Sequence, residues 1–324
     1  MNFIRKNWFL FGLVLLLILG FVAPGLGTFI SYGKLTTTIL IILIFLITGY
    51  TIPTEAIKDG LKDFKLHLFL QGFIFVLVPI YFFLTLKLFE GNFTPETRIG
   101  ILALACIPTT ISSCVIFTQA SGGNTVGAMF NAALANLLGV FISPLLLTFF
   151  LRTSDQTYVA TEISSVIMNI GMKILIPIIV GQVIRQVRIP EKQFKKRLKL
   201  IINMSLLIIV FINFSKSAAD PDFRKMLPTM VFPFIYLAIS FFILLGLSYF
   251  FGRIFNFPRK NLITVLYTAP QKTLAMGVPL LTTFFADSPE LLGAALLPLL
   301  FYHPWQLLVS GFVKSFLAKG EFSK

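Results

Sequence analysis

Charged residues are scarce in this sequence. They make up 12% of its 324 residues, against about 25% in soluble globular domains. Hydrophobic residues make up 56%, and the mean hydropathy is +0.90. The chain is therefore expected to be an integral membrane protein. Its apolar runs are long and continuous and do not alternate with period two, which excludes a membrane β-barrel. The predicted fold class is an all-α polytopic membrane protein.

Cysteine is almost absent, and the common catalytic motifs are missing. Cys106 and Cys114 lie in one apolar run, so they give neither a disulfide framework nor a metal pattern. The sequence has no HExxH motif, no pair of aspartates within an apolar run and no serine-histidine-acid set. A membrane enzyme is therefore not expected, and no cofactor is predicted apart from the sodium ion considered below.

Acidic residues are missing from the interior of every apolar run. All 13 lie at the ends of runs or in loops. A sodium or proton site built on a buried carboxylate, as in many coupled carriers, is therefore not expected. The formal net charge of +14 comes from basic residues in short loops between runs. Membrane orientation accounts for these residues better than a nucleic-acid partner does.

Ten apolar runs are long enough to cross a bilayer. The first follows Arg5 and Lys6 and resembles a signal peptide, but Pro24 and Gly25 are poor cleavage-site residues, so it is interpreted as an uncleaved span. The ten predicted spans are approximately Trp8–Pro24, Thr36–Pro53, Leu66–Phe89, Thr97–Ala120, Thr125–Leu151, Ile163–Val187, Leu198–Phe214, Leu227–Phe251, Asn261–Phe285 and Leu291–Leu317.

The distribution of basic residues predicts the orientation of these spans. Of the 27 lysines and arginines, 18 fall on one side and seven on the other, while Lys173 and Lys272 lie inside spans. Because basic loops stay in the cytoplasm, both termini are predicted to be cytoplasmic in the cell (inner) membrane.

Two pairs of prolines indicate an internal repeat. Pro108 and Pro270 interrupt the fourth and ninth spans, 162 residues apart, and Pro144 and Pro304 lie in the fifth and tenth, 160 residues apart. The halves, residues 1–155 and 156–324, would each hold five spans, and an odd number makes the second half inverted. Paired interruptions in inverted halves indicate the binding site of a transporter.

The second interruption contains an intramembrane lysine. The sequence Tyr267-Thr268-Ala269-Pro270-Gln271-Lys272-Thr273 lies in the middle of the ninth span. A lysine at that depth costs roughly 2.5–3.5 kcal/mol on insertion scales. Pro270 removes a helical donor, so the helix should break here. The lysine could simply be buried at a proline kink and bonded to carbonyls, but a binding site is the favoured interpretation.

The first interruption is rich in hydroxyl groups. These hydroxyls could satisfy carbonyls freed by Pro108, or they could supply ligands to a small cation or donors to an anionic substrate. Asn131 is expected at a depth where it could reach this break, and Gln71 is a further candidate to line the same site. Asn136 could instead form a hydrogen bond that holds two helices together. The hydroxyl residues are Thr109, Thr110, Ser112 and Ser113.

The remaining polar residues inside spans are interpreted more simply. Lys173 is the other intramembrane cation and could lie toward a crevice. His303, in Tyr302-His303-Pro304, is expected to be a hydrogen-bonded packing residue and not a proton relay.

Several blocks of sequence resemble the bile acid:sodium symporter family, solute carrier family 10, and in particular the divergent branch of its seventh human member. The resemblance implies ten spans in two inverted five-helix repeats, with broken fourth and ninth helices that cross. It also implies a core of spans three to five and eight to ten, and a panel of spans one, two, six and seven. The blocks are Pro108–Ser113, Gly122–Asn124, Gly139–Leu147, Pro177–Arg185, Gln271–Pro279 and Tyr302–Pro304.

The departures from that family concern its sodium sites. A Ser-Asn pair of the sodium-coupled relatives falls on Ser113 and Cys114, and their sodium-ligating glutamate falls on Tyr267. Gln271 is retained, but Lys272 follows it, and Gln71 lies about one turn from the place of the family's third-span glutamine. The resemblance therefore implies the fold but not the sodium sites.

The sequence predicts a secondary transporter that moves a small organic anion through the bilayer by alternating access. Lys272 could replace a sodium ion, which would make sodium coupling absent or weak. The first alternative is a sodium-coupled symporter in which Ser112, Ser113, Asn131 and Gln271 hold sodium with neutral oxygens. The second is a non-transporting membrane regulator with the same fold. The predicted crossover site comprises Thr109, Thr110, Ser112, Ser113, Asn131, Gln271, Lys272 and Thr273, supported by Gln71, Cys114, Tyr267 and His303, with breaks at Pro108 and Pro270.

Overall fold

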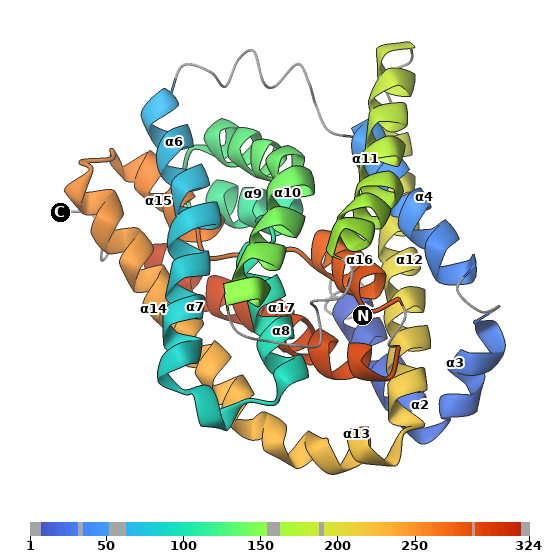
Figure 1. The fold of residues 1–324 in the computed structure, drawn as a ribbon. Coiled ribbons are helices and arrows are strands. Elements are labelled where there is room, and N and C mark those ends of the chain that lie inside the picture. The colour runs from blue at the N-terminus through green and yellow to red at the C-terminus, as the bar shows by residue number, and fades with distance from the viewer. Residues whose placement is uncertain are drawn as a thin grey trace.

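The computed structural model describes residues 8–31, 35–51, 63–153, 163–187, 191–286 and 289–318. These residues form helices joined by short connections, and none of them forms a strand (Figure 1). The main elements are α2 (Trp8–Val22), α3 (Pro24–Ile30), α4 (Leu35–Thr51), α6 (Phe64–Gly72), the π-helical turn η1 (Phe73–Leu77), α7 (Val78–Leu88), α8 (Pro95–Cys106), α9 (Ile111–Ala120), α10 (Thr125–Thr153), α11 (Ile163–Val187), α12 (Lys192–Ala218), α13 (Pro221–Met226), α14 (Val231–Ile254), α15 (Arg259–Thr268), α16 (Leu274–Phe284) and α17 (Pro289–Ala318).

Several of these helices are long and apolar enough to cross a membrane. Five continuous stretches meet that condition, and two bent pairs, α2 with α3 at 104° and α8 with α9 at 57°, raise the number to seven. The shorter apolar helices α4 and α16 lie within two further predicted spans. The all-α, multi-pass membrane architecture agrees with the sequence, whereas ten spans and an inverted repeat stay predictions. The five stretches are Phe64–Leu88, Thr125–Thr153, Gln193–Ala218, Pro221–Ile254 and Leu291–Leu317.

Two predictions lie outside the described residues. Both chain ends, on which the cytoplasmic orientation bears, fall there, and so does the boundary between residues 155 and 156.

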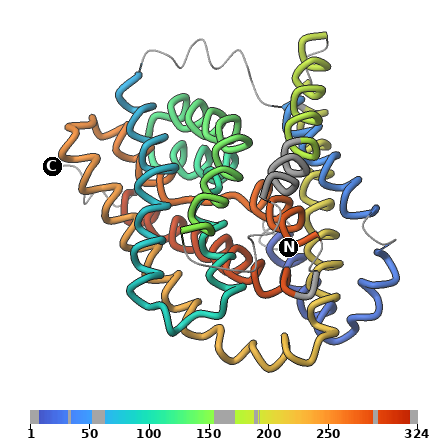
Figure 2. Tube along the Cα trace, in the orientation of Figure 1, coloured from blue at the N-terminus to red at the C-terminus, as the bar shows by residue number. Residues whose placement is uncertain are grey.

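The helices pack in two groups. Helices α2, α3, α4 and α11 pack on α12 or on one another, and we call these five the α12 group. In Figure 2 the blue tube of α2 to α4 lies beside the yellow tube of α12. Helices α6 to α10 and α14 to α17 form the second group, which we call the crossover group. Helices α16 and α17 also pack against α12 and join the two groups.

Glycines allow α4 and α11 to approach closely. A Cβ atom built on Gly49 would lie 2.3 Å from the carbonyl oxygen of Ile178, and one built on Gly181 would lie 2.3 Å from the carbonyl oxygen of Leu46. Any larger residue at either position would force the backbones apart. This pattern of small residues is typical of helices that pack within a membrane.

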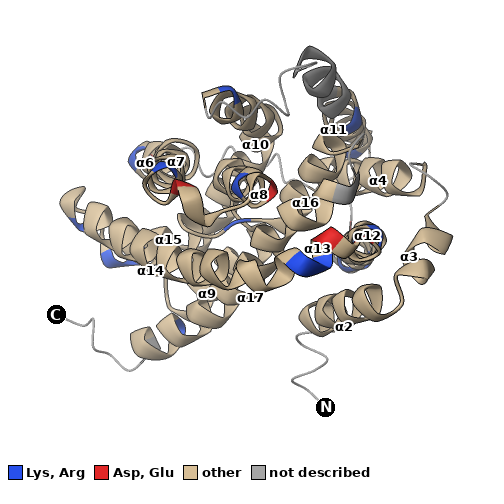
Figure 3. Ribbon diagram, turned by 60° about the horizontal axis from the view of Figure 1, so that its bottom comes forward, with Lys and Arg blue, Asp and Glu red and all other residues tan. Residues whose placement is uncertain are grey.

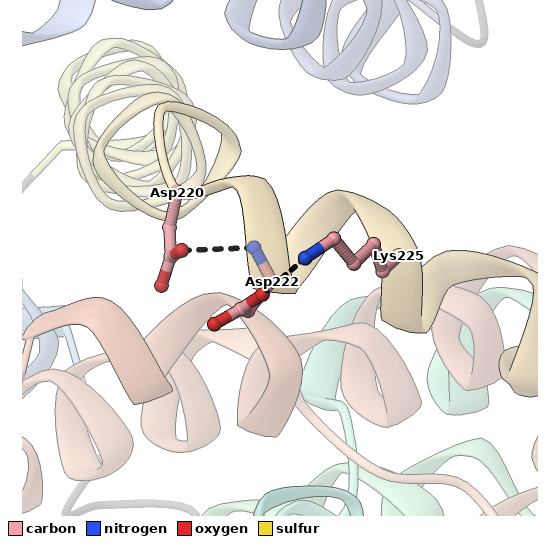
Figure 4. A network of polar contacts seen from close by, with 3 residues as sticks. All are labelled: Asp220, Asp222 and Lys225. Atoms are coloured by element: carbon pink, nitrogen blue, oxygen red, sulfur yellow. Dashed lines mark hydrogen bonds and ion pairs between the residues drawn. The ribbon is translucent and has the colours of Figure 1, made fainter.

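Charged side chains lie mainly near helix ends. Figure 3 shows long stretches of helix without lysine, arginine, aspartate or glutamate. One charged cluster lies on the short helix α13, where the Asp220 carboxylate accepts a hydrogen bond of 2.9 Å from the Asp222 N–H and so caps the helix (Figure 4). The Lys225 ammonium lies 2.9 Å from the Asp222 carboxylate. Because both side chains are exposed, this ion pair contributes little stability.

Candidate functional site

Both proline-containing breaks leave the helical conformation. Helix α8 ends at Cys106 and α9 begins at Ile111, with Pro108 in the non-helical segment between them. Helix α15 ends at Thr268 and α16 begins at Leu274, with Pro270 in the intervening segment. Proline has no backbone N–H and so cannot continue the helical ladder.

The two broken segments touch each other through their backbones. The Thr273 N–H donates a hydrogen bond of 3.0 Å to the carbonyl oxygen of Pro108. Helix α10 closes over this contact, since a Cβ atom on Gly139 would lie only 2.8 Å from Pro108 Cγ. Segments from the two halves of the sequence therefore meet at one point in the crossover group.

Helix α17 fixes the backbone of the second break. The Gln306 Oε1 accepts a hydrogen bond of 2.8 Å from the Lys272 N–H, and the Gln306 Nε2 donates one of 2.8 Å to the Lys272 carbonyl. The Tyr302 hydroxyl donates one of 2.8 Å to the Pro270 carbonyl. His303 lies 3.0 Å from Gln306 through its Nδ1 atom and so supports this amide. These bonds replace the partners that a continuous helix would supply.

The Lys272 ammonium lies at the crossing and binds backbone carbonyls. Its Nζ donates to the carbonyl oxygens of Ala105 and Ile107 at 2.8 Å each and to that of Ile74 at 3.3 Å. The residue is 1% exposed. An ammonium carries three N–H donors, so this geometry gives each of them an acceptor.

The sequence explains why these three carbonyls are free. Ala105 and Ile107 lie at the carboxyl end of α8, where the last carbonyls have no helical donor and carry partial negative charge. In η1 the Val78 N–H turns to Phe73, so Ile74 loses its usual α-helical donor. The donor one residue later would be Pro79, which has no N–H. The Ile74 carbonyl is therefore left for Lys272.

A cluster of hydroxyl and amide groups lies beside the lysine. The Gln271 Oε1 accepts hydrogen bonds from the Thr110 hydroxyl at 2.6 Å and from the Ser113 hydroxyl at 2.7 Å. The Thr110 and Ser113 hydroxyls also lie against each other. Because each hydroxyl has one hydrogen to donate, a hydrogen bond between them would replace one of the two bonds to Gln271. The Gln271 Nε2 donates to the Ser310 hydroxyl of α17 at 3.1 Å. Gln271 is fully buried, and the cluster therefore satisfies a polar side chain deep in the protein.

Asn131 and Gln71 belong to a different polar cluster. The Asn131 Nδ2 lies 2.9 Å from His67 Nδ1, and the Gln71 Nε2 donates to the backbone and side-chain oxygens of Asn131 at 3.2 and 3.3 Å. The α10 amide that reaches the first break is Asn136, whose Nδ2 donates to the Thr109 carbonyl at 2.8 Å. The hydrogen bond from α10 to the first break therefore comes from Asn136, whereas Asn131, which the sequence analysis considered for this break, bonds to His67 and Gln71. The two asparagines are five residues and about 140° apart around the helix, and depth alone does not separate them.

The supporting residues lie in the same region with separate partners. The Tyr267 hydroxyl is 2.9 Å from the Ser121 hydroxyl, and its ring stacks on Phe117 with 5.6 Å between centroids. The Cys114 thiol is buried and lies 3.4 Å from the Ile111 carbonyl. Tyr267 thus fills its position with an aromatic ring, where the resemblance places a sodium-ligating glutamate.

The remaining predicted hydroxyls differ in their surroundings. The Thr273 hydroxyl accepts from the Ala275 N–H at 3.2 Å and caps α16. The buried Thr109 hydroxyl has no hydrogen-bond partner among the described residues. Ser112 is partly exposed at the start of α9.

The oxygen groups considered for sodium do not gather in one place. Asn131 lies in the His67 cluster, and the Gln271 oxygen already accepts two hydroxyl hydrogens. In the part of the chain that the structure describes, no group of three or more histidine, cysteine, aspartate or glutamate residues could hold a metal. The arrangement offers a fixed positive charge and a neutral polar cluster side by side.

Sequence reasoning missed the contribution of α17 and of η1. Tyr302, Gln306 and Ser310 all bond to the second break from one helix. They recur every four residues, which is the spacing of one helical face. This spacing could have predicted a row of polar side chains on one face of the helix. The only sequence feature that could have predicted the π-helical turn at Ile74 was Pro79, which follows the turn.

Comparisons with known proteins give consistent matches along almost the whole chain. The profile of the SBF-like CPA transporter family matches residues 7–319. The zebrafish (Danio rerio) protein named "Sodium/bile acid cotransporter 7" is 31% identical over 318 residues, covering 94% of this chain and 92% of that protein. The Escherichia coli "Putative symporter YfeH" is 27% identical over 299 residues, covering 92% and 88% of the two chains. A Pseudomonas aeruginosa protein named "Uncharacterized protein PA2026" is 29% identical, with 95% and 91% coverage.

Proposed function

Because the chain belongs to the SBF-like CPA transporter family, a family of transporters and not of enzymes, we propose that it carries a small organic anion across the cell membrane by alternating access. We further propose that this transport needs no sodium. One observation supports the second point above all others: the Lys272 ammonium occupies a set of carbonyl oxygens at the crossing of the broken helices.

The tethered ammonium disfavours a sodium ion in the same place. It uses carbonyl oxygens that could otherwise ligate a small cation, and it repels any cation brought close. At a separation of 4 Å two unit charges repel by about 4 kcal/mol at an effective dielectric constant of 20. That cost is equivalent to about a thousandfold loss of affinity. Sodium coupling is therefore absent or weak in this proposal.

The chemistry of the crossing favours an organic anion. Lys272 provides a positive charge, and the hydroxyl groups of Thr110 and Ser113 lie next to it and can reorient to donate hydrogen bonds. The zebrafish relative is named for bile acids, which are organic anions. A bile salt is therefore a reasonable first probe for this chain.

The packing of the helices suits alternating access between two groups. The α12 group contains the predicted spans one, two, six and seven, and the crossover group contains the other six. We propose that these groups are the panel and the core of two inverted five-helix repeats, and that the core moves against the panel. We also propose that both termini are cytoplasmic.

The proposal is tested by uptake of a radiolabelled bile salt, and of a panel of other organic anions, into liposomes that contain the purified protein. Uptake should be equal with sodium or choline as the external cation. Uptake that requires a sodium gradient would instead establish the sodium-coupled symporter. No uptake of any tested anion under either condition would favour the non-transporting regulator.

The sodium-coupled symporter is the second candidate, and one observation favours it. The cluster of Thr110, Ser113 and Gln271 contains neutral oxygens of the kind that sodium accepts, and several relatives are named as sodium cotransporters. A sodium ion there would have to displace hydrogen bonds within the cluster. If sodium binds there, Ser113→Ala should abolish sodium-dependent uptake. If transport needs no sodium, uptake by the Ser113→Ala variant should be the same in sodium and in choline.

A further inference from the structure

Helix α12 has one face that points toward the crossover group. The Asn213 Nδ2 on this face donates a hydrogen bond of 3.3 Å to the Thr282 hydroxyl of α16. Leu206 is buried in the main apolar core, and Ile202 packs against that core. Residues spaced by seven or eleven along a helix share a face, because 3.6 residues make one turn. Asn213 therefore marks the inward face of α12, and Leu206 and Ile202 lie on the same face.

Two lysines continue this inward face beyond the packed region. Lys195 lies eighteen residues, or five full turns, before Asn213, and so points in the same direction. Lys199 lies within about 40° of that direction. The Lys195 side chain is partly exposed, and that of Lys199 is exposed. Neither lysine forms an ion pair with an acidic residue in the described part of the chain, although Glu191 precedes Lys195 by one turn.

The contacts that join α12 to the crossover group lie at its other end. Besides the Asn213–Thr282 bond, the Ser217 hydroxyl accepts a hydrogen bond of 3.0 Å from the Gly293 N–H of α17. In the upper part of Figure 1 the ribbons of α4 and α11 lie apart from those of α6 and α9, while α11 also packs against α10. The lysines thus lie at the end of α12 that is away from its bonds to α16 and α17.

We propose that Lys195 and Lys199 form a positively charged entrance on the α12 side of the transport path, which attracts the anionic solute toward the crossing. A cluster of like charges at the mouth of a path raises the local concentration of a counter-charged solute and so lowers its apparent KM. The identity of the solute as an organic anion rests on the proposed function. The position and sign of the entrance rest on α12 alone.

The first experiment measures this entrance without any transported solute. Ile202→Cys places a reporter thiol on the same face, about 10 Å along the axis from Lys195, while the two native cysteines are buried and set the background. The thiol is reacted with 2-sulfonatoethyl methanethiosulfonate and with its trimethylammonium counterpart. The ratio of the anionic to the cationic rate should fall about three- to tenfold on Lys195→Gln with Lys199→Gln.

A matched control removes the same charge from other faces of the helix. Lys196 and Arg197 lie about 100° and 160° around the helix from Lys195, and both are exposed. The double substitution Lys196→Gln with Arg197→Gln should leave the ratio nearly unchanged. Equal effects of the two double substitutions would overturn the proposal, and so would a reporter thiol that reacts with neither reagent.

Uptake of a radiolabelled bile salt gives the second readout. The double substitution at Lys195 and Lys199 should raise KM about threefold or more at roughly 0.01 M salt, and the effect should vanish near 1 M salt, where the Debye length is about 3 Å. Unchanged KM at low salt would refute a role in solute capture. Failure of every protein to transport any anion would count against the proposed function, while the thiol reactions would still decide whether the entrance is positive.

Discussion

Lys272 shows how a charged residue can be buried without an acidic partner. Its ammonium is satisfied by carbonyl oxygens of Ile74, Ala105 and Ile107, two of which end a half-helix whose dipole favours a positive charge. The buried positive charge is thus satisfied by neutral backbone oxygens. Removing the ammonium takes away the donor that these three buried carbonyl oxygens share.

Lys272→Ala should therefore destabilise the protein. Unsatisfied buried groups cost about 1–3 kcal/mol, and we expect the melting temperature in detergent to fall by several degrees. The wild-type protein should be equally stable in sodium and choline, whereas the variant should be stabilised by sodium, which can occupy the vacated oxygens. Lys272→Met, which keeps most of the aliphatic chain, separates loss of charge from loss of packing.

Lys173→Ala is the matched control, because Lys173 is also in an apolar helix but is partly exposed. It should give no sodium response. If sodium stabilises the wild type, and Ser113→Ala removes that effect, the tethered-cation interpretation is wrong and a retained sodium site replaces it.

The neighbourhood of Pro79 shows how one residue in an element prepares a contact far away in sequence. Without an N–H, Pro79 leaves the Ile74 carbonyl free for Lys272. Pro79→Ala restores an N–H that this carbonyl can accept within its own helix. The loss of melting temperature caused by Lys272→Met should then be smaller in the Pro79→Ala background, by the equivalent of about 1 kcal/mol. Additive effects in this double-mutant cycle would show that the two residues do not share the carbonyl.

The broken helix α8–α9 depends on a close approach by α10. Gly139→Ala would place a Cβ atom 2.8 Å from Pro108 Cγ, so the break or the helix must shift. We expect a loss of about 1–3 kcal/mol in stability, together with reduced transport. Gly246→Ala in α14 is the control, because no atom lies within 4 Å of the added Cβ. It should be neutral or slightly stabilising, since alanine favours helix by roughly 0.5–1 kcal/mol.

The elements of this site differ in how far the sequence could predict them. The breaks at Pro108 and Pro270 were readable, because proline inside an apolar run has a local and unavoidable effect on the backbone. For Lys272 the sequence predicted the kind of partner, a freed backbone carbonyl, but it did not predict that Ile74 would supply one of them. The choice between Asn131 and Asn136 depends on helix rotation within the packed protein, which no local pattern determines.

At the scale of the whole molecule, the α12 group and the crossover group are in close contact where α12 packs against α17. The Gly293 N–H donates to the Ser217 hydroxyl at 3.0 Å, and a Cβ atom on Gly293 would lie 2.3 Å from Ser217 Cβ. Gly293→Ala should wedge α17 away from α12 and so disfavour the conformation described here. We expect the initial rate of solute uptake to fall about tenfold, because a penalty of 1.4 kcal/mol on one state changes its population by that factor.

Gly311→Ala tests whether any alanine in α17 has this effect. Gly311 has no atom within 4 Å of its added Cβ, so this variant should transport at the wild-type rate. The two proteins should be compared at equal amounts of folded protein in the liposomes. A Gly293→Ala protein that is folded and transports normally would show that the close contact between α17 and α12 is not needed for transport.

A cation that is covalently part of the carrier also changes the electrical work of transport. Moving one elementary charge through 100 mV involves about 2.3 kcal/mol, which corresponds to a concentration ratio of roughly fiftyfold. In a sodium symporter the co-transported ions carry positive charge inward and make uptake of an anion possible against an interior-negative potential. The Lys272 ammonium is part of the chain and stays at the crossing, so no concentration gradient of this cation can drive transport. An uncoupled carrier of this kind would therefore move net negative charge in each cycle. An interior-negative membrane potential would then drive the anion out of the cell.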